Sequence, residues 1–250
     1  MLKRLFAAAQ IPAGRILLVH VRLRGISGFC GGDYAAATTA VLDGLLAACP
    51  QLLLVPAYTI YSFLAGRVYH RRFSRSEVGR FSEELRQRGC RRSSDPMYSL
   101  LQISGSLPEH LDYSSTLGDG SVCSYLYRHN AVIVNVDMPG FYATPVHALE
   151  LRHAVPYRRQ QTLAGVVLDS GDVCRQVSYR AYLRPIAADG RVYPPYNQWR
   201  RRDYLRQQGV INTVADHGVH LEWAELEPLA AAIDAVLRRD KLFLVDGWPP

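Results

Sequence analysis

Short apolar runs alternate with amphipathic stretches along the chain. Runs rich in Val, Ile and Leu predict buried strands over residues 16–21, 52–55 and 131–136. The helical spacing of Ala and Leu, with capping residues at the ends, predicts helices over residues 33–48, 76–88, 145–154 and 226–239. This alternation is typical of an α/β layer fold in which helices cover a sheet.

The remaining segments are less regular. Residues 104–121 are rich in Gly and Ser and predict a loop region, and residues 173–183 alternate as a strand does. A stretch rich in Tyr, Pro and Arg occupies residues 191–206. With 250 residues and neither an internal repeat nor a clear linker, the sequence predicts one domain over residues 1–250.

Composition excludes several classes of protein. With 48% hydrophobic and 20% charged residues, the chain can bury a large core and is not disordered. No apolar run approaches the roughly 20 residues that cross a bilayer, so we expect no membrane span. Its five cysteines are scattered and include no C-x-x-C pair. They fit neither a disulfide framework nor a zinc ribbon, and they indicate the reducing cytoplasm.

The net charge is +7, and Lys3 and Lys241 are the only lysines among 29 basic residues. Genomic base composition alone can produce such an excess of arginine. If the excess is functional, guanidinium groups suit phosphates and carboxylates. Residues 200–202 are all arginine and lie beside Trp199 and Tyr204, which leaves a nucleic-acid-binding protein as an alternative. The other arginines are dispersed and no nucleic-acid motif accompanies them, so we do not expect a nucleic-acid partner.

The segment from Thr144 to Glu150 carries the sharpest chemical signal. Thr144 and Pro145 suit the start of a helix that follows a buried strand, where ligands bind in open α/β sheets. Three residues separate His147 from Glu150, which places both side chains on one helical face. A carboxylate that fixes the imidazole tautomer creates a general base, and the alternative is an exposed pair without function.

A metal site is the second alternative for this segment. His153 extends it to H-x-x-E-x-x-H, but six residues turn a helix through about 600°, so the two histidines point apart. His217 and His220 form another pair without a nearby third ligand. We therefore expect no metal.

Further polar segments suit an anionic ligand. The glycine-rich residues 22–32 could hold a pyrophosphate through backbone amides and through Arg22 and Arg24, although they form neither a P-loop nor G-x-G-x-x-G. Residues 91–99 combine guanidinium groups with hydroxyls, and residues 118–121 read Gly-Asp-Gly-Ser.

The order of these segments resembles the aminoglycoside 3-N-acetyltransferase family over about residues 15–155. The resemblance is carried by His20-x-x-Leu23, Gly28, Gly31-Gly32, Val55-Pro56-x-x-Thr59, Val78-Gly79, Glu84-x-Arg86, Arg92-Ser93-x-x-Pro96-x-x-Ser99, Gly118-x-x-Ser121 and Thr144-x-x-His147-x-x-Glu150. It implies a three-layer α/β/α domain with a central mixed sheet, distinct from the GNAT fold. It also implies transfer of an acetyl group from acetyl-coenzyme A to an amine on a sugar ring.

Site residues follow from the resemblance. His147 would be the general base, Glu150 its partner, and Thr59 a stabiliser of the oxyanion. The residues expected along coenzyme A are Arg22, Leu23, Arg24, Gly25, Ser27, Gly28, Arg92, Ser93, Ser99 and Ser121. Residues 15–155 would then form the coenzyme and catalytic half, and residues 156–250 the acceptor half. Either a monomer or a homodimer is compatible with the sequence.

This chain departs from the family where Asp95 replaces a histidine, and its tail after residue 155 follows the family loosely. A catalytically inactive relative is therefore an alternative, against which the intact His147 and Glu150 argue. The tail carries eight arginines between Arg175 and Arg206, a charge that attracts anions and repels polycations. We therefore expect the acceptor to be a nucleotide-linked amino sugar for surface polysaccharide, stacked on Tyr193, Tyr196 or Trp199, with an aminoglycoside as the alternative.

Overall fold

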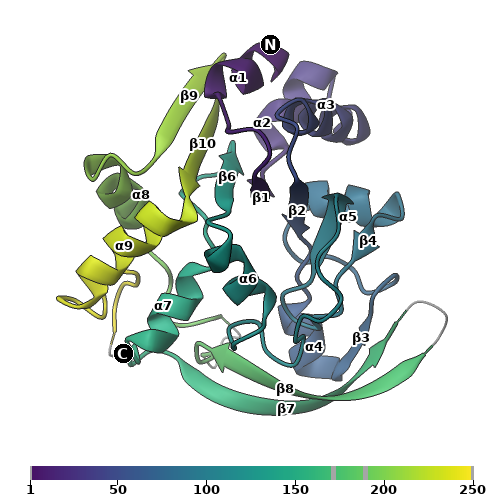
Figure 1. Ribbon diagram of the computed structural model, residues 1–250, viewed down its shortest axis with the longest axis vertical. Helices are drawn as coiled ribbons and strands as arrows, with labels where there is room; N and C mark the ends of the chain where they lie inside the picture. The colour runs from purple at the N-terminus through teal and green to yellow at the C-terminus, as the bar shows by residue number, and fades with distance from the viewer. Residues whose placement is uncertain (1, 170–172, 188–190, 249–250) are drawn as a thin grey trace.

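A seven-stranded mixed sheet forms the centre of the computed structural model, which describes residues 2–169, 173–187 and 191–248 (Figure 1). The strands lie in the order β4-β5-β2-β1-β6-β10-β9. Their bounds are β1 Ile16–Val21, β2 Leu52–Pro56, β4 Arg91–Arg92, β5 Leu100–Ser104, β6 Val132–Val136, β9 Asn212–Asp216 and β10 Val219–Glu225. The central strand β1 is parallel to β2 and β6, and the outer pairs are antiparallel.

Helices cover both faces of this sheet, and they form the two outer layers (Figure 1). One face carries α1 Leu2–Ala9, α3 Tyr34–Leu46 and α5 Arg80–Gln87. The other carries α6 Val122–Arg128, α7 Val146–Arg152 and α9 Leu226–Leu237. The remaining helices are α2 Arg24–Ser27, the 3₁₀ turn η1 Gly28–Cys30, α4 Ile60–Gly66 and α8 Gln198–Gln207. No helix among the described residues is long and apolar enough to cross a bilayer.

Alternation along the buried strands explains the three layers. In β1, Ile16 and Leu18 point to the core on the α7 side, whereas Leu17 and Val19 point to the core on the α3 side. A strand with apolar side chains on both faces is stable only when both faces are covered. The strand therefore specifies a sheet between two helical layers, as the sequence predicts.

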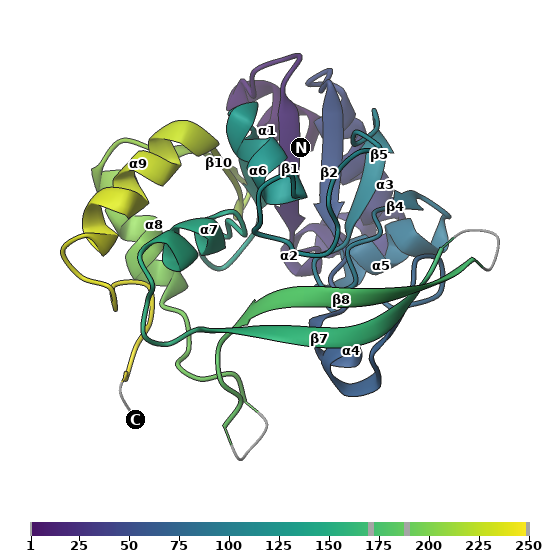
Figure 2. The same ribbon diagram turned by 60° about the horizontal axis from the view of Figure 1, so that its bottom comes forward.

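A second, three-stranded sheet lies beside the ends of the central strands (Figure 2). It consists of β3 Val68–His70, β7 Arg159–Leu168 and β8 Cys174–Leu183 in that order. Phe63, Tyr69 and Tyr179 are fully buried in its own small core. The hairpin of β7 and β8 also contacts the loop before α6, since Arg180 donates its backbone N–H to Ser114 O at 2.8 Å.

Most elements predicted from hydrophobic spacing are present. The helix predicted from Asp33 is α3, and the Asp33 carboxylate caps it by accepting from Ala35 N at 2.8 Å and Ala36 N at 3.1 Å. The predicted strands correspond to β1, β2, β6 and β8, and the predicted helices to α3, α5, α7 and α9. The fold is thus the three-layer α/β/α arrangement that the resemblance implies.

Two parts of the chain differ from the prediction. The glycine-rich residues 22–32 contain two short helical turns, α2 and η1, rather than an open loop. The stretch over residues 191–206 contains α8, whose sequence QWRRRDYLRQ lacks an apolar stripe. The buried side of this helix includes Arg202, which forms an ion pair with Glu222 at 2.9 Å. Because a charged residue occupies a buried position, the sequence lacks the apolar periodicity that indicates a helix.

Candidate active site

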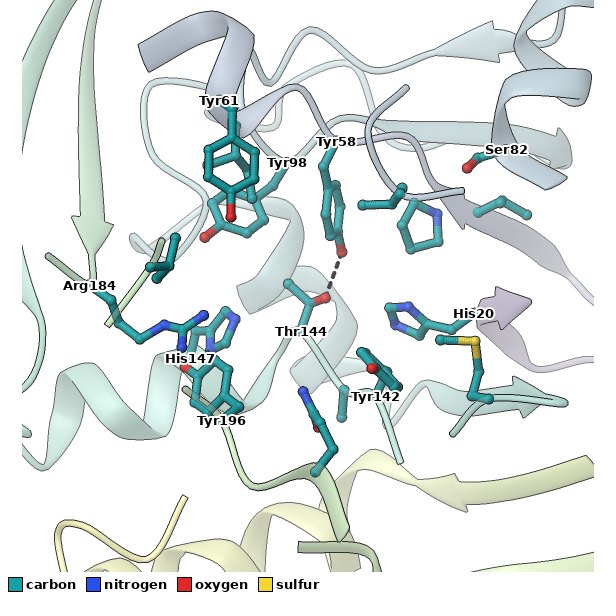
Figure 3. A pocket seen from close by; sticks show the side chains of 18 of the residues that line it. His20, Tyr58, Tyr61, Ser82, Tyr98, Tyr142, Thr144, His147, Arg184 and Tyr196 are labelled. Carbon is teal, nitrogen blue, oxygen red and sulfur yellow. Dashed lines mark hydrogen bonds between the residues drawn. The ribbon is translucent and has the colours of Figure 1, made fainter. Parts of the chain in front are cut away.

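A cavity of about 420 Å³ opens at the carboxyl ends of the central strands (Figure 3). His20 and Val21 from β1 and Pro56 from β2 line one side of it. The segment that follows β6 contributes Thr144 and His147. Residues after position 155 complete the wall, namely Arg158, Leu183, Arg184, Ile186, Val192, Tyr196, Gln198 and Arg201. The cavity therefore lies between residues 15–155 and the part of the chain that follows them.

His147 and Glu150 are hydrogen-bonded to each other on the first turns of α7. The distance from His147 Nδ1 to Glu150 Oε2 is 2.6 Å. Since a carboxylate accepts this bond, the hydrogen lies on Nδ1, and Nε2 is left with a lone pair. The ring of Tyr196 stacks on the imidazole at 5.7 Å, and Tyr98 packs against it edge-on at 6.3 Å. The predicted pair thus exists, and its imidazole is held in one orientation.

Four donors surround the Glu150 carboxylate, which is fully buried. Tyr157 and Tyr196 donate to Oε1 at 2.8 and 2.7 Å, and Arg158 Nε lies 3.0 Å from Oε2 beside the His147 bond. Burial alone raises the pKa of Glu150. The guanidinium of Arg158 and the bond from His147 oppose burial, and together they hold this pKa well below its usual range. Glu150 is therefore a carboxylate at neutral pH, with its negative charge balanced by Arg158.

The imidazole of His147 is neutral at the same pH. Burial lowers its pKa to about 4, the positive charge of Arg158 adds to this effect, and Glu150 opposes it. Arg158 Nη2 lies 3.2 Å from His147 Nδ1 and 3.4 Å from His147 Nε2, so a guanidinium N–H also approaches the Nε2 lone pair. The lone pair of a neutral imidazole can accept a proton from a bound ligand, which is what a general base requires.

Protonation of the two cavity histidines gives a testable pH dependence of stability. Burial lowers the pKa of His20 to about 3 and that of His147 to about 4, whereas both titrate near 6.5 when unfolded. Between these values the unfolded chain binds more protons, so the free energy of unfolding should fall as the pH decreases from about 6.5. Urea denaturation at about pH 5 and about pH 7.5 measures this difference. Equal stability at the two pH values would contradict the burial of neutral histidines.

Thr59 does not face the cavity. It is buried, and its hydroxyl donates to Pro96 O at 2.7 Å. Several other hydroxyl side chains line the cavity, and among them Thr144 and Tyr58 form a pair whose oxygens are 2.6 Å apart (Figure 3). The oxyanion role of Thr59 stays a prediction, and in this structure its hydroxyl hydrogen is bonded to Pro96 O instead of pointing into the cavity.

The ten residues expected along coenzyme A do not line this cavity. Six of them lie in or beside α2, directly after the β1 residues that do line it. Arg22 and Arg24 are exposed there, and Arg22 pairs with Asp137 at 3.3 Å. Leu23 and Ser27 are buried, whereas Gly28 is exposed. A Cβ on Gly25 would lie 2.7 Å from Asp137 Oδ2, so any other residue there would require the Asp137 carboxylate to shift.

The other four residues belong to the buried framework. Arg92 donates to Ser99 Oγ at 3.0 Å and to the carbonyl of Ala57, and Ser99 donates to the same carbonyl at 2.8 Å. Ser93 Oγ accepts from Leu100 N at 2.9 Å. Ser121 is the N-cap of α6, with Oγ 3.3 Å from Ser124 N. All four side chains are buried and hydrogen-bonded within the protein, and their contact with coenzyme A stays a prediction.

Asp95, which replaces the family's histidine, has a structural role. Its buried carboxylate accepts from Met97 N, Tyr98 N, Thr116 Oγ1 and Tyr179 Oη at 2.7–3.0 Å. It therefore fixes the turn before β5 and joins that turn to β8. The replacement leaves the His147 cluster intact.

Sequence reasoning missed several residues of the site. Arg158 follows Pro156 in an irregular segment, and nothing in its spacing indicates that it pairs with Glu150. Of the three aromatic residues proposed for stacking, only Tyr196 lines the cavity, whereas Trp199 is 58% exposed. His153, considered as a metal ligand, instead bonds Asp234 at 2.9 Å. The described residues contain no group of three or more His, Cys, Asp or Glu side chains suited to a metal.

Comparison with known proteins identifies the family. The family profile described as aminoglycoside 3-N-acetyltransferase matches residues 18–236. Similar solved structures include AAC-IIIb in a binary complex with CoASH (TM-score 0.70, 14% identity, 99% of this chain and 97% of that chain). They also include AAC-VIa bound to sisomicin (0.67, 16%, 95% and 96%) and the YokD protein from Bacillus subtilis (0.69, 15%, 96% and 98%). Among curated protein sequences, none matches this chain. The chain belongs to the aminoglycoside 3-N-acetyltransferase family and is an acyltransferase.

Proposed function

We propose that the protein transfers the acetyl group of acetyl-coenzyme A directly to an amine of a small amino sugar. The observation that carries this proposal is the bond of 2.6 Å between His147 and Glu150 at the wall of the cavity. Coenzyme A is the co-substrate of the family, and AAC-IIIb, which shares the fold, is described in complex with it. The cytoplasm, where the five free cysteines would stay reduced, is the proposed location.

In the proposed mechanism, the acceptor amine reacts in its unprotonated form, after an ammonium has lost one proton to solvent, and His147 Nε2 removes a further proton as the nitrogen attacks the thioester carbonyl. The new C–N bond forms, the C–S bond breaks, and His147 returns the proton to the departing thiolate. Glu150 keeps the Nδ1 hydrogen in place and stabilises the imidazolium that forms during the reaction. No acyl-enzyme is needed, because the thioester is already activated and burial raises the pKa of the Cys123 thiol to about 12.

We assign the oxyanion contact to the Tyr58–Thr144 hydroxyl pair. Burial raises the pKa of Tyr58 well above its usual value, so its hydroxyl keeps its hydrogen and can donate. The pair faces the same cavity as His147 (Figure 3). A preorganised donor of this kind stabilises the charge that develops on the carbonyl oxygen.

The variants Thr144→Val and Thr59→Val separate the two threonines. Removal of the hydroxyl in Thr144→Val should lower kcat by about 10- to 100-fold, somewhat less than loss of a whole oxyanion-hole donor. Thr59→Val loses a buried bond to Pro96 and should lower the free energy of unfolding by about 1–3 kcal/mol, with kcat nearly unchanged. Steady-state kinetics and urea denaturation of both variants measure these effects. A large loss of kcat in Thr59→Val alone would return the oxyanion role to Thr59.

The coenzyme phosphates are proposed to lie along α2, outside the cavity. The support is that Arg22 and Arg24 are exposed there and that α2 directly follows the β1 residues of the cavity wall. Gly25 and Gly28 carry no side chain that would keep a phosphate away from the backbone. The thioester would then reach His147 through the pantetheine arm.

Two acceptor classes remain as candidates. AAC-VIa, a relative in fold, is described bound to sisomicin, which favours an aminoglycoside. The nucleotide-linked amino sugar expected from the charge of the tail is favoured by three arginines in the cavity wall, Arg158, Arg184 and Arg201. Both candidates present an amine on a sugar ring, and both therefore agree with the proposed chemistry.

Release of free thiol from acetyl-coenzyme A tests the proposed function. The protein is incubated with sisomicin or with a uridine-diphosphate-linked amino sugar, and kcat/KM is compared at physiological ionic strength. Acetyl transfer to either acceptor, lost in His147→Ala, supports the proposal. A higher kcat/KM for sisomicin assigns the protein to aminoglycoside acetylation. Absence of acceptor-dependent thiol release with any amine would refute the proposal.

A further inference from the structure

The charges around the cavity do not balance. Arg158, Arg184 and Arg201 line it, and no Asp or Glu is among the described residues of its wall. Glu150 lies behind the wall and neutralises Arg158 at 3.0 Å. Among the described residues, Arg184 and Arg201 have no carboxylate partner, whereas an aminoglycoside carries several positive charges that such a cavity would repel.

Arg201 is the more unusual of the two. It is 3% exposed, and it donates only to neutral oxygens, the carbonyl of Phe141 and the amide of Gln198. Its Nε is buried and has no hydrogen-bond partner among the described residues. The adjacent arginines of α8 differ, because Arg200 pairs with Asp246 and Arg202 with Glu222. An unpaired buried charge is costly, and such groups are typical of sites that receive a counter-charge from a ligand.

His20 supplies a second unpaired group beside Arg201. Its Nε2 is buried and has no partner among the described residues. Burial and the nearby charge of Arg201 lower the pKa of His20 to about 3, so the ring is neutral and one nitrogen can donate. In Figure 3 the imidazole of His20 points across the cavity toward Thr144. The ring of His20 lies 6.1 Å from the ring of Tyr142, the residue after Phe141, whose carbonyl accepts from Arg201. The two unsatisfied groups on α8 and β1 are thus joined through one segment of the cavity wall.

Arg184 places a further positive charge beside His147 in the cavity (Figure 3). Its guanidinium lies 4.0 Å from the centre of the Tyr196 ring, and it donates to Pro194 O at 2.5 Å. No described Asp or Glu lies within ion-pair distance of this side chain. Both ends of the cavity therefore present positive charge to a ligand.

We propose that the Arg201–His20 end of the cavity is a subsite for an anionic group, a carboxylate or a phosphate, on the acceptor. This inference rests on the proposed function for its identification of the ligand as the acceptor. Coenzyme A is a poor candidate, because its reacting thioester is uncharged and its phosphates lie beyond the pantetheine arm. Arg201 by contrast lines the cavity itself and bonds the side chain of Gln198, which also lines it.

Three probes with the same ring and amine test the subsite, namely glucosamine, glucosamine 6-phosphate and muramic acid, which carries a carboxylate. Binding is measured by calorimetry at constant ionic strength, without acetyl-coenzyme A. At least one anionic probe should bind about 10- to 100-fold more tightly than glucosamine, the usual effect of a hydrogen bond to a charged group. The comparison of phosphate with carboxylate identifies the anion.

Arg201→Gln should abolish this preference, and Arg200→Gln is its matched control. Both variants remove one charge from adjacent positions of α8, but Arg200 does not line the cavity. His20→Ala should also weaken the anionic probes while leaving glucosamine binding unchanged, and it serves where Arg201→Gln does not fold. Equal or undetectable binding of the three probes, or a preference that both variants retain, would overturn the subsite.

The same experiment separates the subsite from the proposed function. Binding of an anionic probe that depends on Arg201, without acetyl transfer to any amine, would refute the function and retain the subsite. Acetyl transfer with the same kcat/KM for all three probes, in wild type and in Arg201→Gln, would retain the function and refute the subsite.

Discussion

Replacement of His147 by Ala is expected to lower kcat by about 10²- to 10⁴-fold, the usual effect of losing a general base. The acceptor amine is mostly protonated at neutral pH and therefore depends on a base. The other histidine in the described cavity wall is His20, which we assign to the anion subsite with Arg201. The affinity for coenzyme A should stay nearly unchanged, because no phosphate contact involves His147 in this account. Steady-state thiol release and calorimetry with coenzyme A measure the two quantities.

His153→Ala is the matched control for this variant. His153 follows the last turn of α7, outside the cavity, and its Nε2 bonds Asp234 at 2.9 Å. Its loss should alter stability slightly and leave kcat within about twofold of the wild-type value. Wild-type turnover by His147→Ala at saturating substrate would show that another group is the base.

Glu150→Ala is expected to lower the free energy of unfolding by about 3–5 kcal/mol, because it leaves Arg158 buried without its counter-charge. The hydroxyls of Tyr157 and Tyr196 would lose their acceptor at the same time. Glu150→Gln keeps the shape of the side chain, and it should lower kcat in the same direction as His147→Ala but less strongly. Urea denaturation of both variants at neutral pH provides the measurement.

An ion pair with one exposed member is the control for this effect. Glu84, which is partly buried on α5, pairs with the exposed Arg80 at 2.8 Å, and Glu84→Ala should change stability by no more than about 1 kcal/mol. A similarly small change in Glu150→Ala would mean that the carboxylate does not balance Arg158. The low pKa of Glu150 also predicts how this effect depends on pH. The carboxylate stabilises the folded protein above its unfolded pKa, and this stabilisation is lost as the pH falls below about 4.5.

The layered fold could be predicted because its strands carry a strong local signal. The runs that became β1, β2 and β6 are apolar on both faces, and such runs require cover on both sides. The long strands β7 and β10 were not predicted. Exposed Arg159, Gln160 and Gln161 begin β7, and buried Glu222 interrupts β10, so neither segment shows a clean apolar period.

The hydrogen-bonded pair proposed for catalysis could also be predicted, since His147 and Glu150 are neighbours on one helix. The groups that tune the pair could not, because they come from distant parts of the chain. Arg158 precedes β7 and Tyr196 precedes α8, and only the folded chain brings them to the Glu150 carboxylate. The framework role of Arg92 and Ser99 was likewise hidden, since a buried hydrogen bond to Ala57 leaves no trace in spacing.

The mass spectrum of acceptor and protein after incubation with acetyl-coenzyme A tests whether the acetyl group passes directly to the acceptor with His147 as the base. Wild-type protein should add the mass of one acetyl group to the acceptor, with the group placed on nitrogen by fragmentation. The protein itself should remain unmodified throughout, and His147→Ala should leave the acceptor almost unchanged. Acetylated protein on the path to product, or an acetylated acceptor formed equally by His147→Ala, would contradict direct transfer with His147 as the base.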